Sequence, residues 1–125
     1  MKIALFQRHG NDALWHAQAL PGLLAQAGDS GCDLAVFPEG LPFMDDRSPI
    51  AHEAAVRQLE DVAGTGDGGA FIAGGCVREG RHVRNRAYLV SGGQVTPWYD
   101  KQIVWPGETF TPGRQAQRFT WPGGA

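Results

Sequence analysis

The sequence predicts an α/β protein built around a layered sheet, and three observations lead to this prediction. Short apolar runs alternate with segments of helical periodicity in the first half of the chain. Three strand-like runs separated by glycine-containing turns follow in the second half. The chain also has 18 glycines and 8 prolines, so its elements are expected to be short. The resulting order is β-α-β-α-β-β-β, in which βαβ units precede a hairpin meander.

The first predicted unit is a strand followed by a helix. Residues 2–7 are predicted as a strand buried on both faces, because residues 3 to 6 are all apolar. A helix capped by Asn11 or Asp12 is expected over residues 13–27, where apolar side chains recur at three- or four-residue steps. Pro21 interrupts this pattern, so a kink or two short pieces are expected.

The second unit repeats this arrangement. Residues 33–37 are predicted as a buried strand that ends at Pro38. Ser48 as a cap and Pro49 in the first turn then predict a helix with an apolar stripe that ends near Gly64.

The second half is predicted to contain three strands, a long loop and a short last strand. The strands cover residues 71–77, 83–91 and 94–99, the loop covers 100–113, and the last strand covers 118–121. Gly92 and Gly93 predict a tight hairpin turn between the second and third of these strands.

Composition and charge exclude several classes of function. A chain of 125 residues has the size of one domain. The formal net charge of −2 gives no support to binding of nucleic acid or an anionic membrane. No apolar run approaches the ~18 residues of a membrane span. Two cysteines without a CxxC motif are typical of the reducing cytoplasm, although a disulfide between Cys32 and Cys76 stays possible.

Glu39 is the first candidate site residue. It follows directly after the predicted strand 33–37 and Pro38, at the carboxyl edge of the sheet, where α/β folds place ligands. A partly desolvated carboxylate at this place is suited to general-base catalysis. The alternative interpretation is a solvent-facing glutamate at the start of a loop.

Lys101 is the second candidate, and it is one of only two lysines in the chain. Aromatic and apolar residues surround it within the segment 98–105 and are expected to desolvate it. A buried ammonium group stabilises a developing oxyanion, and Glu108 is close enough in the same loop to hold it. The alternative interpretation is an ordinary exposed lysine in a loop.

Other patterns in the chain are given structural interpretations. Residues 64–69 match GxGxxG, but they follow a helix and precede a strand, so a flexible loop is expected instead of a nucleotide site. The hairpin also carries a basic patch that consists of Arg78, Arg81, Arg84 and Arg86. Given the negative net charge, this patch is expected to be solvated and not to bind phosphate. Both cysteines are expected to be buried structural thiols, and the histidines lack the spacing of metal ligands.

Two motifs stand in a fixed order and spacing along the chain. The first is Asp-Leu-Ala-Val-Phe-Pro-Glu at residues 33–39. The second is Tyr-Asp-Lys-Gln-Ile-Val-Trp-Pro-Gly-Glu at residues 99–108, followed by Phe-Thr-Pro-Gly at 110–113. Residues 85–90 and 2–7 complete the pattern. In this order the segments resemble the nitrilase (carbon–nitrogen hydrolase) superfamily over essentially the whole chain.

This resemblance implies a nitrilase-like αββα sandwich, of which residues 1–125 would form the incomplete N-terminal part. It also implies hydrolysis of non-peptide C–N bonds in small amides or nitriles, by a Glu-Lys-Cys triad and a thioester intermediate. In that chemistry Glu39 would be the general base and Lys101 would stabilise the oxyanion. Glu108 would position the substrate and Lys101. The resemblance implies no cofactor and no metal.

The nucleophilic cysteine of the family follows the Lys motif on a later strand, whereas Cys32 and Cys76 both precede that motif. The nucleophile is therefore expected to be absent from this chain, which would be inactive alone. It would need a homo-oligomer or a complementing chain, because a sheet without its covering layers exposes apolar surface. One alternative is a non-catalytic remnant or interaction module of the same fold. Another is an unrelated small α/β binding domain, in which Glu39 and Lys101 would lie far apart.

Overall fold

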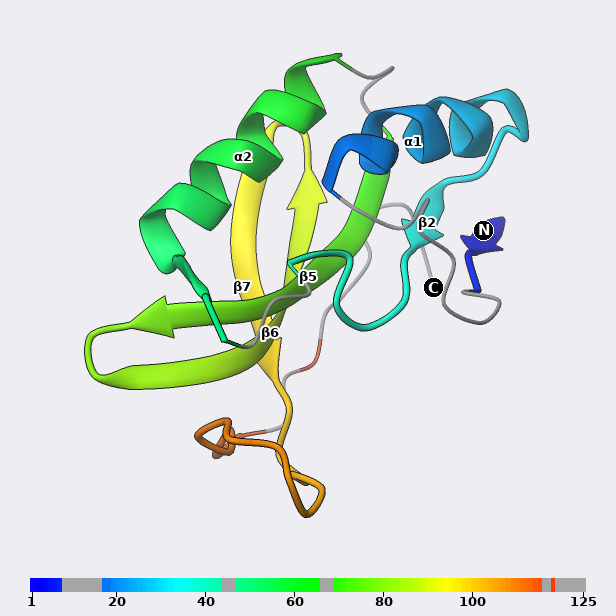
Figure 1. Ribbon diagram of the computed structural model, residues 1–125. Helices are drawn as coiled ribbons and strands as arrows, with labels where there is room; N and C mark the ends of the chain where they lie inside the picture. Colours follow the sequence, from blue (N-terminus) through cyan, green and yellow to red (C-terminus); the bar gives the residue numbers. More distant parts are fainter. Residues whose placement is uncertain (8–16, 44–46, 66–68, 116–117, 119–125) are drawn as a thin grey trace.

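A mixed sheet with two helices packed on one of its faces forms the protein (Figure 1). The structure is a computed structural model that describes residues 1–7, 17–43, 47–65, 69–115 and 118. Its elements are β1 (Ile3–Leu5), the 3₁₀ turn η1 (Ala17–Ala19), α1 (Leu20–Asp29), β2 (Leu34–Val36), β3 (Pro42–Phe43), β4 (Ile50–Ala51), α2 (His52–Thr65), β5 (Ala70–Glu79), β6 (His82–Ser91) and β7 (Gln94–Asp100).

The central strand is β5, which has partners on both edges. On one edge it pairs in parallel with β2, β3 and β4, which follow one another along its length. On the other edge it pairs antiparallel with β6, which in turn pairs with β7. β1 adds to the far side of β2, so the main order is β1-β2-β5-β6-β7.

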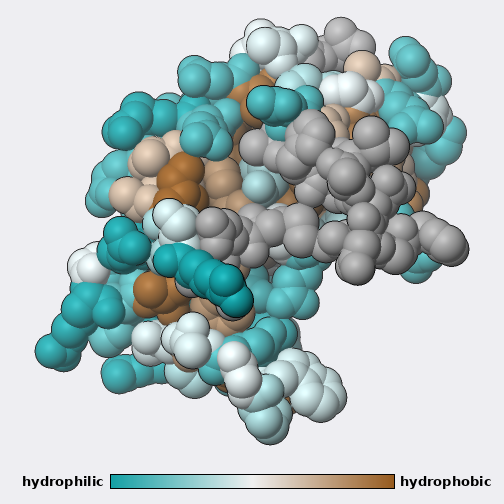
Figure 2. All heavy atoms as spheres, in the orientation of Figure 1, coloured by the Kyte–Doolittle hydropathy of each residue, from teal (hydrophilic) through white to brown (hydrophobic). Residues whose placement is uncertain are grey.

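One face of this sheet shares a hydrophobic core with both helices. Ala35, Phe71 and Val90 are aligned across β2, β5 and β6, and Ala73 is aligned with Tyr88. Because side chains alternate along a strand, all five point to the same face. They are packed there with buried residues of the helices, namely Leu20, Ala27, Ala55 and Leu59. In Figure 2 most of the described surface is hydrophilic or weakly polar, and hydrophobic residues show only in small areas.

The opposite face of the sheet is also apolar, and the helices do not cover it. Leu5, Val36, Ile72 and Leu89 form a row across β1, β2, β5 and β6 on this face. Leu5 is 71% exposed and Ile3 is 45% exposed. The prediction that the first strand is buried on both faces was therefore wrong. Ala4 packs against the core on one face, whereas described residues leave the face of Ile3 and Leu5 uncovered.

The helices begin differently from the prediction. α1 begins at Leu20, and Pro21 lies in its first turn after η1, so the interruption produces two short pieces. The expected caps Asn11 and Asp12 lie outside the described residues. α2 begins at His52, four residues after Ser48, because the intervening β4 pairs with β5.

The strands of the second half and their turn agree closely with the sequence prediction. Gly92 and Gly93 have φ of 59° and 77°, as a tight hairpin turn requires. The two-residue strands β3 and β4 were not predicted. Of the expected last strand, only Arg118 is described, and it has no regular structure. No helix among the described residues is long and apolar enough to cross a membrane.

Gly74 and Gly75 allow the neighbouring backbones to approach β5. A Cβ atom on Gly74 would lie 1.9 Å from the carbonyl oxygen of Arg86, and one on Gly75 would lie 1.9 Å from that of Phe43. Gly75 also has a φ of 142°, which side chains disfavour.

We expect Gly74→Ala to lower the free energy of unfolding by about 3 kcal/mol or more, because the methyl group collides with backbone that cannot rotate away. Urea titration followed by circular dichroism measures this change. Gly64→Ala is the matched control, since its Cβ meets nothing within 4 Å. The control should raise the free energy of unfolding by about 0.5 kcal/mol through its effect on α2. Equal effects of the two substitutions would contradict the packing argument.

Candidate functional site

Glu39 lies in the connection between β2 and β3, which both pair with β5. This connection is tied to β5 at both ends. The amide of Phe37 donates to the carbonyl of Ile72 at 3.0 Å, and the amide of Gly74 donates to the carbonyl of Leu41 at 2.7 Å. The parallel pairing therefore holds Glu39 over the middle of β5, at the carboxyl end of β2.

Lys101 follows directly after β7 and is fixed by its own backbone. Its amide donates to the carbonyl of Asn85 at 2.9 Å, and its carbonyl accepts from the amide of Gly113 at 2.9 Å. Its ammonium Nζ lies 3.0 Å from Oε1 of Glu39 and 2.8 Å from Oε1 of Glu108. One cation thus joins two carboxylates that are far apart in the sequence.

Glu108 and Asn85 complete this group. The second oxygen of Glu108, Oε2, accepts from the backbone amide of Trp105 at 2.8 Å, so both oxygens of this carboxylate have donors. The side-chain amide of Asn85 donates to Oε1 of Glu39, the same oxygen that accepts from Lys101. Among the described residues, Oε2 of Glu39 has no hydrogen bond in this group.

The charges of the group shift two of its pKa values. The pKa of Lys101 is raised above its ordinary 10.5, first by the hydrogen bond to Glu108 and then by that to Glu39. The pKa of Glu108 is lowered below its ordinary 4.5, first by Lys101 and then by the amide of Trp105. Lys101 thus stays a cation, and Glu108 an anion, throughout the neutral range.

A cavity of about 240 Å³ lies beside these residues. Its polar lining residues are Glu39, Asn85, Arg86 and Lys101, and its apolar walls include Phe37, Ile72, Ala87 and Tyr99. Ile72 and Asn85 are on the sheet face opposite the helices, as the register of β5 with β6 shows. The cavity is therefore open to a small, largely apolar ligand with a polar group at the lysine.

The structure brings all three predicted site residues together. Because Glu39 and Lys101 line one cavity, the alternative of an unrelated small α/β binding domain, in which these residues lie far apart, is wrong. The expected burial is only partly present, since the side chain of Glu39 is 59% exposed and that of Lys101 is 21% exposed. Ile103 and Trp105 point to solvent and do not cover Lys101 as expected. Described residues cover only the helix side of the sheet, which explains the exposure of Glu39.

No disulfide joins Cys32 and Cys76. Cys76 is buried on β5, as expected, and is not among the residues that line the cavity. Cys32 is only half-buried, and its thiol donates to the carbonyl of Ala27 at 3.3 Å. Among the described residues, no group of three or more His, Cys, Asp or Glu side chains is placed to hold a metal ion.

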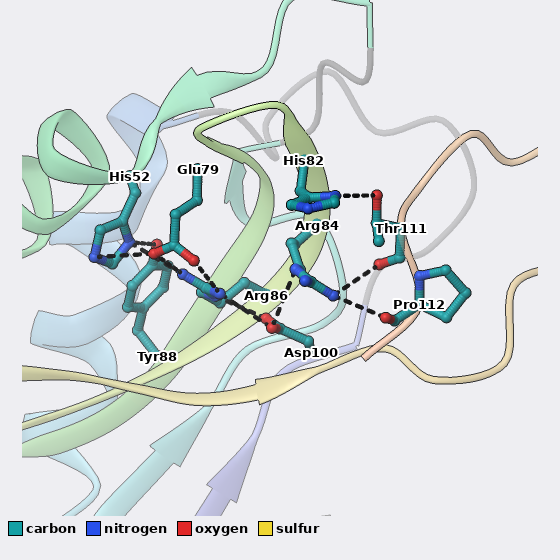
Figure 3. Close-up of polar contacts among 9 residues, drawn as sticks. All are labelled: His52, Glu79, His82, Arg84, Arg86, Tyr88, Asp100, Thr111 and Pro112. Atoms are coloured by element: carbon teal, nitrogen blue, oxygen red, sulfur yellow. Dashed lines mark hydrogen bonds and ion pairs between the residues drawn. The ribbon is translucent and has the colours of Figure 1, made fainter. Parts of the chain in front are cut away.

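The prediction of a solvated arginine patch was wrong for two of its four members. Arg78 and Arg81 are exposed as expected. Arg84 is half-buried beside Asp100, and Arg86 is only 7% exposed and forms ion pairs with Glu79 and Asp100 (Figure 3). The cause is strand register, which places Arg86 opposite Asp100. The missed signal is the match of two arginines with the acidic residues at the ends of β5 and β7. Asn85 was missed as a site residue for the same reason, since only the pairing of distant strands brings it to Glu39.

No model of a known protein family matches the sequence, and no curated protein matches it. Solved structures do match. A cysteine-to-alanine variant of the amidase from Nesterenkonia sp. AN1, a member of the nitrilase superfamily, was solved in complex with butyramide. It matches with a TM-score of 0.76 at 26% identity, over 99% of this chain and 52% of that chain.

Two further solved structures show the same fold. A glutamate-to-glutamine variant of the Nesterenkonia amidase, with acrylamide added at its active-site cysteine, has a TM-score of 0.73 at 23% identity over 99% of this chain and 54% of that chain. A CN-hydrolase superfamily protein from Xanthomonas campestris, with an arsenic adduct in its active site, has a TM-score of 0.71 at 18% identity over 98% of this chain and 49% of that chain. The chain therefore spans about half the length of the solved structures it matches.

The ion pairs of Lys101 are directly testable, because the chain has only two lysines and lysine labelled with ¹³C and ¹⁵N gives two side-chain signals. We expect Lys101 to titrate above 10.5 in the folded chain and Glu108→Gln to lower its pKa more than Glu39→Gln does. Lys101 contributes stability that is complete below its unfolded pKa and lost as the pH rises through the raised folded value. Glu108 contributes stability that is complete above its unfolded pKa and lost as the pH falls through its lowered folded value.

Glu60→Gln on α2 is the control for this titration, because Glu60 is exposed on the helix side of the sheet. The control should leave the pKa of Lys101 unchanged. An unchanged pKa in both site variants would show that the two carboxylates do not contact Lys101 in solution.

Proposed function

Because the chain has the fold of the nitrilase (carbon–nitrogen hydrolase) superfamily, as the N-terminal part of that domain, we propose that it carries the Glu and Lys of a site that hydrolyses non-peptide C–N bonds. The observation that supports this proposal most is the contact of one ammonium group, Lys101 Nζ, with both Glu39 and Glu108 beside a cavity. This arrangement combines a general base, an oxyanion-stabilising cation and a carboxylate that holds the cation in place.

Glu39 is the general base in this proposal. Its Oε1 accepts hydrogen bonds from Lys101 and Asn85, which leaves Oε2 to take a proton from a cysteine thiol. The thiolate sulfur then attacks the amide carbon, and the π electrons of the carbonyl move to its oxygen. When the tetrahedral intermediate collapses, the proton on Glu39 goes to the departing amine and a thioester remains. Glu39 next takes a proton from water, and the water oxygen attacks the thioester carbon. Collapse of this second tetrahedral intermediate releases the acid and expels the thiolate, which takes the proton back from Glu39.

Lys101 stabilises the oxyanion in both halves of this reaction. Its raised pKa supports the role, because the group must be a cation at neutral pH. Glu108 holds Lys101 through Oε1 and is itself held by the amide of Trp105 through Oε2. Because Glu108 is already fixed, it holds the ammonium group of Lys101 in place before the reaction, so little side-chain entropy of Lys101 is lost in the transition state.

The nucleophilic cysteine comes, in this proposal, from the second half of the fold. The related amidase has an active-site cysteine, and this chain matches only about half of its length. Neither Cys32 nor Cys76 lines the cavity of Glu39 and Lys101. The apolar row on the open sheet face, with Leu5 at its exposed end, is the surface that the second half would cover. The 125 residues alone are therefore inactive and depend on a complementing segment, chain or subunit.

A small amide is the proposed substrate. The cavity of about 240 Å³ accommodates few non-hydrogen atoms, and its walls are mostly apolar around one polar end. The related amidase was solved with butyramide, which has this shape and polarity. The competing function is a non-catalytic interaction module of the same fold, which would bind partners through exposed apolar side chains such as Ile103 and Trp105. Reading the coding sequence beyond residue 125 for a Cys-bearing strand separates the two.

The activity test compares the 125-residue chain with the chain extended by the second half of the fold. We expect ammonia release from butyramide only in the extended protein. In that protein Glu39→Gln and Lys101→Ala should each lower kcat by about 10²- to 10⁴-fold, because each removes a group that acts in the transition state. Glu60→Gln, remote from the cavity, should leave kcat unchanged. Wild-type kcat in either site variant would refute the assigned roles.

Cys76→Ser tests whether Cys76 is the nucleophile. We expect the 125-residue chain to be inactive with or without this substitution. Hydrolysis by the 125-residue chain that disappears in Cys76→Ser would show that the chain supplies its own nucleophile and needs no second half.

A further inference from the structure

The loop that carries Lys101 and Glu108 is held at both ends by arginines of β6 (Figure 3). We infer that Arg84 and Arg86 are positioning residues that clamp this loop and so set the place of the Lys101 ammonium group. The inference rests on the proposed function, in which Lys101 and Glu108 belong to the reacting site. Neither arginine touches Lys101, so both act through the residues that they bind.

Arg86 holds the start of the loop. Its Nε donates to Oδ1 of Asp100 at 2.7 Å and its Nη2 donates to Oδ2 at 3.0 Å. This two-point contact fixes the plane of the carboxylate as well as its position. Asp100 is the last residue of β7 and directly precedes Lys101, so the contact also orients the first peptide of the loop.

A second set of contacts holds Arg86 itself. Glu79 at the end of β5 accepts from both Nη atoms, at 3.0 and 3.2 Å. Nδ1 of His52 lies 3.3 Å from Nη1 and 2.9 Å from the hydroxyl of Tyr88. These two contacts place the imidazole of His52 between the guanidinium group of Arg86 and the hydroxyl of Tyr88. Burial raises the pKa of Tyr88 to about 12, which keeps its hydroxyl protonated. With all these partners in place, the guanidinium group has little freedom to move.

Arg84 holds the end of the loop. Its Nη1 donates to the carbonyl of Pro112 at 2.8 Å and to that of Thr111 at 3.5 Å, and its Nε lies 3.7 Å from Oδ2 of Asp100. The amide of Thr111 donates to the carbonyl of Val83 at 2.7 Å. Arg84 therefore connects both ends of the loop to β6.

The clamp matters because the loop between its ends has little other support. Residues 101–113 contain no helix or strand, and Ile103 and Trp105 point to solvent. Among the described residues, the hydrogen bonds of the Glu108 carboxylate all lie within the loop, to Lys101 and Trp105. The backbone hydrogen bonds of Lys101 to Asn85 and Gly113 hold the main chain at the ends of the loop, and the arginines add the side-chain contacts there. We expect that loss of these side-chain contacts loosens the ends of the loop and weakens the Lys101–Glu108 contact.

The test is the titration of labelled Lys101 in Arg84→Ala, with Arg81→Ala as the matched control. Arg81 is on the same hairpin but is exposed. Removal of a nearby positive charge would by itself raise the pKa of Lys101. Loss of the Glu108 and Glu39 contacts would lower it. We expect the pKa to fall in Arg84→Ala and to stay unchanged in Arg81→Ala. An unchanged or raised pKa in Arg84→Ala would overturn the inference.

Cleavage by a protease that cuts after lysine gives a second measurement in the same variants. We expect cleavage after Lys101 to be about tenfold faster in Arg84→Ala than in wild type, which corresponds to the loss of one charged hydrogen bond. Arg86→Lys, which keeps the charge but loses the two-point contact, should behave like Arg84→Ala if it folds. Wild-type cleavage in Arg84→Ala would contradict the clamp. Neither readout depends on hydrolysis of an amide, so the clamp and the proposed function fail or stand separately.

Discussion

The two-sided pairing of β5 is the constraint on which the rest of the structure depends. Three short segments, β2, β3 and β4, take successive places along one edge of this strand, and β6 occupies the other edge. The peptide that carries Glu39 joins β2 to β3 on that edge, and hydrogen bonds to Ile72 and Gly74 hold both of its ends against β5. The antiparallel edge brings Asn85 from the other side. The candidate site therefore lies where the parallel and antiparallel parts of the sheet meet.

Neighbouring residues of β6, and of the end of β7 with Lys101, form two separate polar groups. Asn85 and Lys101 contact Glu39 at the cavity, and Arg86 and Asp100 form an ion pair on the helix side of the sheet. Successive side chains of a strand point to opposite faces, so one register places both pairs. On each face one cation contacts two carboxylates, which for Arg86 are Glu79 and Asp100. The buried arginine group is structural, and the partly exposed lysine group is left accessible from the cavity.

Most of the regular structure could be predicted because its signals are local. Apolar runs mark β2, β5 and β6, and the glycine pair marks the hairpin into β7. The two-residue strands β3 and β4 have no periodicity of their own, and they exist only because β5 offers an unpaired edge. Because β4 pairs with β5, α2 begins at His52 and not at the predicted start near Ser48. Burial of Arg86 also depends on register, which composition and spacing do not reveal.

The sequence by itself determined the kind of protein and the candidate residues. Glu39 was selected because it follows a buried strand at the carboxyl edge of the sheet. Lys101 and Glu108 were selected because they share an apolar loop, and the resemblance to the nitrilase superfamily linked all three residues. Only the tertiary structure decided that these side chains contact one another, that Asn85 joins them, and that Arg84 and Arg86 hold the loop. The reason is that each of these contacts joins strands or loops distant in sequence, and their geometry is set by strand register.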